Sequence, residues 1–114
     1  MLAKKYRIIK EDDFDKVKKE GKLVQKALFG ASILKRGDED NSKFGFIVST
    51  KISKFSTHRN RIKRAMHEAV RHSLNRINDG FNVLFLAKKS ILKASTEEIM
   101  REVKELLEEG GITK

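Results

Sequence analysis

The sequence predicts an α+β fold in which three helices pack on one sheet of about four strands. Residues 56–77 and 95–110 each carry apolar side chains at the 3.6-residue spacing of a helix with one buried face. Short apolar runs bounded by turn residues occupy residues 22–50 and 81–88, as strands do. With a first helix near residue 12, the order αββ(β)αβα predicts a two-layer α/β sandwich with a mostly antiparallel sheet.

Length and composition limit the classes of function. The 114 residues fit one domain, so we expect residues 1–114 to form a single domain. The absence of cysteine excludes disulfides, thiolate nucleophiles and zinc–thiolate sites. No apolar run approaches the roughly 20 residues of a membrane span, and the first residues lack a signal-peptide pattern. We therefore expect a cytoplasmic protein that does not contact membranes.

The first helix follows from local signals in KEDDFDKVKKEGK, residues 10–22. Asp12 or Asp13 can cap its start, and Gly21 is a stop signal. Phe14 and Val17 share one face at i, i+3 spacing. The sequence therefore predicts a short helix between these two signals.

The strands are predicted from the apolar runs that follow. KLVQKALFGASILKR, residues 22–36, is rich in apolar side chains and predicts a strand bent near Gly30. The turn residues GDEDNS at 37–42 predict a hairpin, with KFGFIVST at 43–50 as the returning strand. FNVLFLAK, at 81–88, suits a buried central strand.

The two later helices are predicted from their apolar stripes. In the first, Ser56 or Thr57 can cap the start, Asp79-Gly80 closes the end, and the stripe comprises Ile62, Ala65, Met66, Ala69, Val70, Ser73 and Ile77. In the second, Ser95 and Glu98 have capping-box spacing, and the helix stops at Gly110. Its apolar face comprises Ile99, Val103, Leu106 and Leu107.

Basic side chains are concentrated in the body of the chain. The 26 Lys and Arg residues against 16 Asp and Glu give a net charge of +10. Residues 1–94 hold 23 basic and 10 acidic side chains, whereas residues 95–114 hold 3 basic and 6 acidic ones. A strongly basic small domain most often binds nucleic acid, with an anionic membrane or an acidic protein as lesser alternatives.

STHRNRIKRAMHEAVR, residues 56–71, departs from the usual charge pattern of a helix start. A helix N-terminus favours acidic residues, yet these first turns contain Arg59, Arg61, Lys63 and Arg64. Residues 51–76 hold eight basic residues and a single acid. The planar fork of arginine suits bidentate phosphate contacts, and the first N–H groups point the same way. We predict a polyanion-binding surface over the outward polar residues Asn60, Arg61, Lys63, Arg64, His67 and Arg71.

No residue pattern indicates an autonomous enzyme. His67 and His72 are five residues apart, so they do not form an i, i+4 metal pair, and His58 lies across the first turn. The acids at 38–40 fit turn chemistry. No Gly-rich phosphate loop opens a helix, and no serine or carboxylate has an evident general-base partner. We therefore expect neither a catalytic group nor a metal site in the chain.

The basic helix and its surroundings resemble the protein subunit of bacterial ribonuclease P. RNRIKR at 59–64 is preceded by GFIVSTKISK and followed after the helix by VLFLAKK. YRIIKEDDFDKVKKEGK, residues 6–22, also matches the family's N-terminal pattern of Arg-hydrophobic, Asp-Phe, Val and Gly-Lys. The resemblance runs from Arg7 through the last helix, nearly the whole chain.

The resemblance implies an RNA-binding domain in a ribonucleoprotein endonuclease. In this family a catalytic RNA, with magnesium held by the RNA, removes the 5′ leader of precursor tRNA, and the protein alone is inactive. The protein, expected to be a monomer, binds that RNA and the leader. The implied contacts to the catalytic RNA are Arg59, Asn60, Arg61, Lys63 and Arg64. The family fold has a left-handed crossover that displays this helix.

The resemblance also implies a leader-binding set: Phe14, Lys18, Ser32, Lys51, Lys54 and Lys88. Two of its members depart from the family. Lys18 stands where many relatives have a second aromatic, and Ser32 stands where a tyrosine is common. His67 occupies a position that is more often arginine. A groove with fewer stacking rings should depend more on charge, since stacking on a base is worth roughly 1–3 kcal/mol.

Other readings of the basic helix remain open from the residues alone. A ribosomal-type or other structured-RNA protein without a role in cleavage would share it. A DNA-binding domain would need a trio of base-reading side chains, and only Asn60 is evident. A membrane-surface helix would need bulky apolar residues opposite the charges, whereas Ala65, Ala69 and Ser73 are small.

Overall fold

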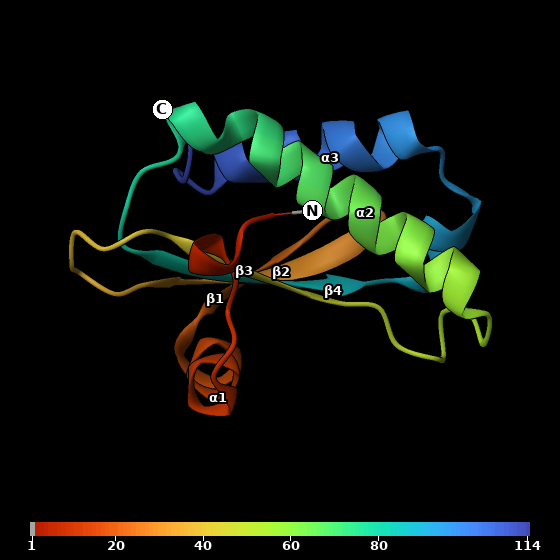
Figure 1. The fold of residues 1–114 in the computed structure, drawn as a ribbon, viewed down its shortest axis with the longest axis horizontal. Helices are drawn as coiled ribbons and strands as arrows, with labels where there is room; N and C mark the ends of the chain where they lie inside the picture. The colour runs from red at the N-terminus through yellow and green to blue at the C-terminus, as the bar shows by residue number, and fades with distance from the viewer. Residues whose placement is uncertain (1) are drawn as a thin grey trace.

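Four strands form one mixed sheet in the computed structural model, which describes residues 2–114 (Figure 1). The strands are β1 (Lys22–Gln25), β2 (Phe29–Lys35), β3 (Lys43–Ile47) and β4 (Phe81–Ala87), and they lie in the order β1-β2-β4-β3. β1 pairs antiparallel with β2, β2 pairs antiparallel with β4, and β3 pairs parallel with β4. The predicted sheet is confirmed, with one parallel pair at the β3 edge.

Helices cover both faces of this sheet. α2 (Ser56–Ser73) and α3 (Thr96–Glu109) lie on one face, and α1 (Glu11–Glu20) lies on the other (Figure 1). Short 3-10 helices occur at Lys4–Tyr6, Leu74–Arg76 and Lys89–Lys93. The predicted α+β class and element order are confirmed, and α1 adds a third layer to the two that were predicted.

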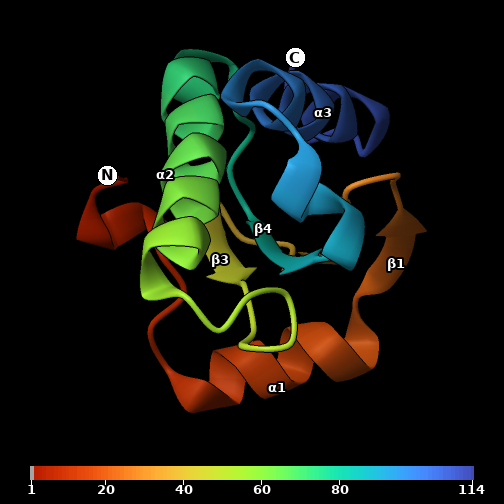
Figure 2. The ribbon, with the colours of Figure 1, turned by 90° about the vertical axis from the view of Figure 1, so that its right-hand side faces the viewer.

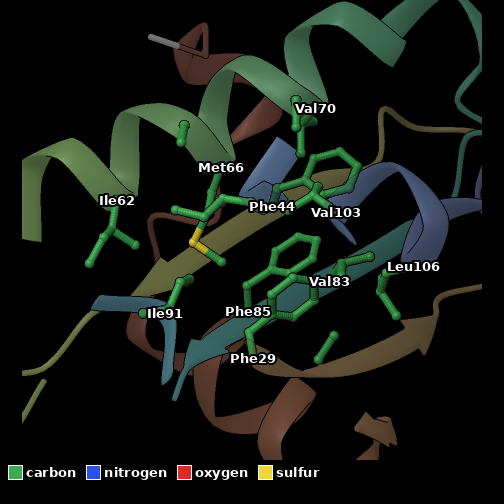
Figure 3. Close-up of a cluster of buried hydrophobic side chains, with 14 of the residues drawn as sticks. Phe29, Phe44, Ile62, Met66, Val70, Val83, Phe85, Ile91, Val103 and Leu106 are labelled. Atoms are coloured by element: carbon green, nitrogen blue, oxygen red, sulfur yellow. The ribbon is translucent and has the colours of Figure 1, made fainter. Parts of the chain in front are cut away.

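Each face of the sheet has its own apolar core. Under α2 and α3, the rings of Phe29 and Phe85 meet edge to face with their centres 5.3 Å apart (Figure 3). The predicted stripes are buried from Ile62 to Ser73 on α2 and from Ile99 to Leu107 on α3. A smaller cluster of Ile8, Val17 and Leu84 lies under α1. Since the stripe of α2 is buried, its polar side is the part left for binding.

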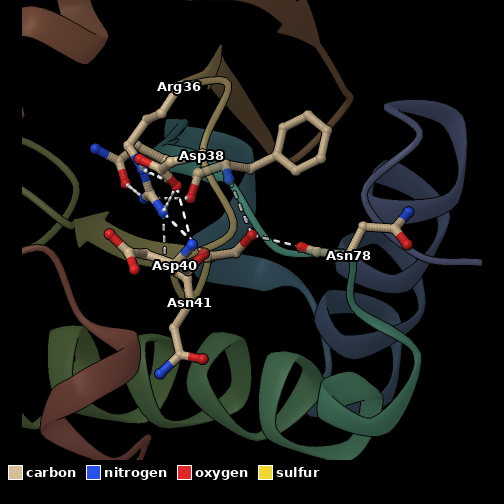
Figure 4. Close-up of polar contacts among 8 residues, drawn as sticks. Arg36, Asp38, Asp40, Asn41 and Asn78 are labelled. Carbon is tan, nitrogen blue, oxygen red and sulfur yellow. Dashed lines mark hydrogen bonds and ion pairs between the residues drawn. The ribbon is translucent and has the colours of Figure 1, made fainter.

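The connection between β2 and β3 is not the predicted hairpin, because β4 lies between these strands. Arg36 organises the connection (Figure 4). Its guanidinium donates to the carboxylate of Asp38, to the side-chain oxygen of Asn82 and to the carbonyls of Phe81, Asp40 and Asn41. The hydrogen bond from Arg36 lowers the pKa of Asp38. The turn residues were identified correctly, but the partner of β3 is more than 30 residues away in sequence.

β3, α2 and β4 form a left-handed crossover. In Figure 2 both parallel strands run toward the viewer, α2 lies above them, and β4 lies to the right of β3. Most crossovers of this kind are right-handed, so the handedness is unusual. It agrees with the expectation from the resemblance and places α2 over the β3 edge of the sheet.

Several local predictions are wrong. The N-cap of α1 is Lys10 rather than Asp12 or Asp13, and those acids lie in its first turn, where they still favour the helix. The strand predicted over 22–36 is two strands, because the chain turns at residues 26–28 rather than bending at Gly30. α2 ends at Ser73 and continues only as a 3-10 turn, well before residue 79.

Candidate nucleic-acid interface

The start of α2 has no capping side chain and no acid in its first turn. The N-cap is Phe55, so the predicted caps at Ser56 and Thr57 are wrong. Asn60 and Arg64 are exposed on the next turns. Because the first N–H groups of a helix lack internal acceptors, backbone and side-chain donors are presented together. This arrangement can bind an anion.

Part of this surface borders a hollow of about 390 Å³ between α2 and α3. Asn60, Arg61 and Arg64 line it from α2, and Thr96 and Met100 line it from α3. The start of α3 therefore adjoins the basic turns of α2. The hollow combines apolar side chains with two guanidinium groups and with the carboxylate of Glu68, which is paired with Arg71. The guanidinium groups and the apolar side chains suit the phosphate and sugar of a nucleic-acid backbone.

Two of the predicted arginines also hold neighbouring segments in place. Arg59 donates from Nη1 to the carbonyl of Ser53 at 2.8 Å, which fastens the loop before α2. Arg61 donates to the carbonyls of Ala94 and Leu92 at 3.3 and 3.2 Å, which fastens the segment before α3. Each guanidinium has five N–H donors, so both retain donors for a ligand.

Arg71 lies at the other end of the predicted surface and is already paired. Its Nη2 lies 2.7 Å from a carboxylate oxygen of Glu68, and its Nε donates to the same carboxylate at 3.0 Å. Arg71 lowers the pKa of Glu68, and Glu68 raises that of Arg71. The pair is exposed, so this charge is partly neutralised and contributes less to an anion site than Arg64 does.

His67 does not belong to the outward side of α2, so the predicted contact of this residue with RNA is wrong. The side chain is only 6% exposed. Its Nδ1 accepts a hydrogen bond from the N–H of Leu2 at 3.4 Å, and its ring centre lies 4.3 Å from that of Phe46. Burial, and then the charges of Arg7 and Lys63, lower the pKa of His67 to about 4. The N-terminal segment covers this turn, which the helical pattern alone cannot show.

The predicted leader set is dispersed, and one member is excluded. Ser32 is 4% exposed, and its hydroxyl donates to the carbonyl of Val17 at 2.7 Å, so it holds α1 on β2 and its predicted leader contact is wrong. Phe14 packs on β3, where a Cβ added to Gly45 would lie 2.8 Å from a carbon of the ring. Phe14 as a whole residue is partly exposed.

The lysines of the leader set occupy three places. Lys18 is exposed on α1, one turn after Phe14. Lys51 and Lys54 are exposed in the loop between β3 and α2. Lys88 follows β4, and its ammonium donates to the carbonyl of Lys26 at 2.6 Å, which ties it to the turn between β1 and β2. Within residues 2–114, the ammonium groups at the first two places make no hydrogen bond or ion pair, although that of Lys54 lies over the ring of Phe55.

A second basic hollow, of about 510 Å³, was not predicted. Its basic lining comprises Lys4, Lys5, Arg7, Lys10 and Lys43, with Asp13 as the one acid. The Nε of Arg7 is buried and has no hydrogen-bond partner among residues 2–114. The bridge between Arg7 and Phe44 brings the N-terminal cations to the start of β3. The basic residues at 4–10 are the one feature of the sequence that could have indicated this hollow. Their proximity to Lys43 depends on the fold.

Comparisons with known proteins identify the family. The family model described as Ribonuclease P matches residues 2–110. The chain belongs to the ribonuclease P protein family. The ribonuclease P protein component of Synechocystis sp. is 32% identical over 111 residues, which cover 97% of this chain and 90% of that protein. That of Alkaliphilus oremlandii is 35% identical over 101 residues, with 89% and 87% covered.

Solved structures of ribonuclease P proteins share the fold. The protein from Staphylococcus aureus, at 25% identity, gives a TM-score of 0.87 over 96% of this chain and 98% of that chain. The protein from Thermotoga maritima, at 26% identity, gives a TM-score of 0.79 over 90% of this chain and 96% of that one. Family membership identifies the chain as a subunit of an endoribonuclease complex that processes tRNA, with ribonuclease P RNA as its partner.

Residues 2–114 contain neither a cluster of metal ligands nor a membrane-spanning helix. No three His, Cys, Asp or Glu side chains in this range gather so that they could hold a metal ion. No helix in the same range is long and apolar enough to cross a membrane.

Proposed function

We propose that the chain binds the catalytic RNA of ribonuclease P through the start of α2. The observation that carries this proposal is a helix start with exposed cations and neither a cap nor an acid in its first turn. Within residues 2–114, the side chains of Asn60, Lys63 and Arg64 make no hydrogen bond or ion pair, so their donors are available. Arg59 and Arg61 contribute the donors that their carbonyl contacts leave free.

The 5′ leader of precursor tRNA is proposed to bind elsewhere on the same chain. Phe14, a partly exposed residue, and Lys18 place a ring and an ammonium group one helical turn apart on α1. Lys51 and Lys54 supply further charge in the loop before α2. The second basic hollow extends the positive surface toward the N-terminus. A single strand of RNA requires such a combination of ring and charge.

The division of labour follows from the groups that the protein presents and from its family. The described residues offer phosphate-binding donors at the start of α2. In line with the family resemblance, we assign cleavage of the leader to the RNA and its magnesium ions, and substrate and RNA binding to the protein. The chain acts in the cytoplasm as a monomer within the ribonucleoprotein and is inactive alone.

Reconstitution tests this function. Purified protein is added to the host's ribonuclease P RNA at low magnesium, and cleavage of precursor tRNA is followed. The expected result is that RNA alone is nearly inactive, protein alone is inactive, and the mixture cleaves at the 5′ end of the mature tRNA. Tight binding of protein to the RNA with no gain in cleavage would instead support a structured-RNA protein with no role in cleavage.

Leader binding is tested separately with precursor tRNAs whose leaders have about one and about five nucleotides. Lys18→Gln should weaken holoenzyme binding of the long-leader substrate more than that of the short one, because only the longer strand reaches α1. The control is Lys22→Gln, which removes the same charge from an exposed position on β1. Equal effects of Lys18→Gln on both substrates would contradict the leader path over α1.

A further inference from the structure

Phe55 is an exposed aromatic side chain immediately before the basic turns of α2. It is 56% exposed, and the other large apolar side chains of residues 2–114 that are comparably exposed, Ile9 and Leu23, are aliphatic. A single exposed apolar residue is ordinary on a protein surface. The position, fixation and surroundings of Phe55 distinguish it from Ile9 and Leu23.

Hydrogen bonds around Ser53 fix the backbone and neighbours of Phe55. The N–H of Phe55 donates to the Oγ of Ser53 at 3.2 Å, and the same Oγ lies 3.1 Å from the Nδ1 of His58. Arg59 donates to the carbonyl of Ser53 at 2.8 Å. The ring of His58 meets that of Phe55 at 64°, with centres 5.4 Å apart. The ring is therefore presented by a fixed loop, which lowers the entropy lost when a ligand binds.

The surroundings of the ring are cationic. The Nζ of Lys54 lies 5.6 Å from the ring centre. Lys51 is exposed in the same loop, and Arg59 follows in the first turn. Residues 41–67 contain no acid at all. Sites for single-stranded nucleic acid combine an aromatic face for a base with cations for the adjoining phosphates, and this is the combination found here.

We propose that Phe55 is a stacking platform for an unpaired nucleobase of RNA. The base stacks on the ring, and Lys54 and Arg59 contact the phosphates on either side of it. This inference rests on the proposed function, because it takes RNA as the ligand of the α2 start. It also places a ring outside the two positions, Lys18 and Ser32, at which the resemblance led us to expect aromatics.

Substitution separates stacking from charge. Phe55→Leu keeps an apolar side chain but removes the aromatic face, and should weaken RNA binding by about 5-fold to 100-fold. Phe55→Tyr keeps the ring and should bind like the wild type. Phe55→Leu should leave the salt dependence of binding unchanged, whereas Lys54→Gln should reduce it. Leu23→Ala, at an exposed position on β1, is the control and should change neither.

Fluorescence provides a direct readout, because the chain contains no tryptophan. Phe55→Trp introduces the only indole at the proposed platform, and Leu23→Trp introduces it at the control position. Stacking on a base should quench the first indole and not the second. Quenching by catalytic RNA alone assigns the base to that RNA, whereas quenching only after precursor tRNA with a long leader is added assigns it to the leader.

Two results would overturn the proposal. One is the absence of quenching in the complete holoenzyme with bound precursor tRNA. The other is an equal loss of affinity in Phe55→Leu and Phe55→Tyr. The Arg64→Ala variant is measured in parallel, since it tests RNA binding by α2 without involving Phe55. If Arg64→Ala weakens RNA binding while the indole of Phe55→Trp is not quenched, only the stacking platform is wrong. If Arg64→Ala binds RNA as the wild type does and the indole is not quenched, the proposed function is wrong.

Discussion

α2 and α3 pack against each other on one face of the sheet, and their N-termini differ in capping and in charge. At α3, the Oγ of Ser95 accepts from the N–H of Glu98 at 3.1 Å, and the Glu98 carboxylate accepts from the N–H of Ser95 at 3.4 Å. Glu97 and Glu98 place negative charge at the positive end of the helix. α2 has no side-chain cap and no acid in its first turn. Its start therefore lacks the local interactions that stabilise α3.

The difference indicates what each helix start is for. Capping and acidic first turns stabilise a helix by satisfying N–H groups and the macrodipole within the chain. A helix start that leaves these groups unsatisfied and adds cations is suited to a ligand that supplies the negative charge. Departures from local rules of this kind are expected at functional sites. Variants of the two helices can test this comparison.

The largest effect on RNA affinity is expected for Arg64 of α2, whose side chain makes no hydrogen bond or ion pair within residues 2–114. Arg64→Ala should weaken binding of the catalytic RNA by about 10-fold to 100-fold, since a hydrogen bond to a charged group is worth roughly 1.5–3 kcal/mol. Its melting temperature should stay near that of the wild type. Arg101→Ala removes an exposed arginine of α3 and is the control. Titration of labelled RNA measures the affinity of both variants. An equal loss of affinity in Arg101→Ala would contradict the claim that α2, and not α3, binds the RNA.

Arg59 and Arg61 sharpen the same comparison, because each has a structural contact as well. Arg59→Ala and Arg61→Ala should weaken RNA binding and also lower the free energy of unfolding by about 1 kcal/mol, the usual worth of one hydrogen bond. Chemical denaturation measures the second effect. If neither variant is destabilised, the carbonyl contacts of these arginines do not contribute to the fold.

His67 lies on α2 after the basic turns, and its burial should make the stability of the protein depend on pH. Its pKa in the folded chain, about 4, lies below its usual value of 6.5, so only the unfolded chain gains a proton as pH falls between these values. The stability contributed by neutral His67 is present above pH 6.5 and is lost as the pH falls toward 4. In melting curves over this range, His67→Gln should flatten the profile. The exposed His72→Gln is the control, and the same flattening there would contradict burial as the cause.

The cap of α3 should affect stability without affecting function. Ser95→Ala should lower the free energy of unfolding by about 1 kcal/mol, because the capping box is disrupted at the start of the helix. Ser56→Ala on α2 should cost much less, since that residue makes no cap hydrogen bond. Denaturant midpoints measure both effects. Neither variant should change the affinity for RNA, because neither removes a positive charge.

The smallest effect is expected when α2 is given an acid in its first turn, as α3 has. Thr57→Glu places an acid in the first turn of α2 and should stabilise the protein by about 0.3–1 kcal/mol through the helix macrodipole. The same charge should weaken RNA binding, because it faces phosphate. Thr57→Gln is the uncharged control. A variant that is more stable and binds RNA equally well would show that the missing acid has no connection with function.

The sequence predicted those features whose cause is local. The stripe from Ile62 to Ser73, the Ser95 capping box and the buried strand at 81–87 were all identified, because periodicity and capping act within a few residues. The parallel partner of β3 and the side of the sheet that holds α1 depend on contacts distant in sequence. No local pattern reports them.

The candidate site was predicted in part for the same reason. The basic turns of α2 were evident, and Arg64 is exposed as expected. His67 and Ser32 are buried by segments that precede them by many residues, Leu2 for the first and α1 for the second. Phe55 lies between the strand predicted at 43–50 and the helix predicted from residue 56, and only the structure shows that it is exposed next to Lys54 and His58.

The central claim is that the start of α2 binds phosphates of RNA, and the salt dependence of binding tests it most directly. The dissociation constant for the catalytic RNA is measured against salt concentration for the wild type, for Lys63→Gln/Arg64→Gln, and for the control Arg101→Gln/Lys104→Gln on α3. The account predicts a slope smaller by roughly 0.7–0.9 for each phosphate that the α2 variant no longer neutralises, and an unchanged slope in the control. An unchanged slope in the α2 variant, or an equal reduction in both, would contradict it.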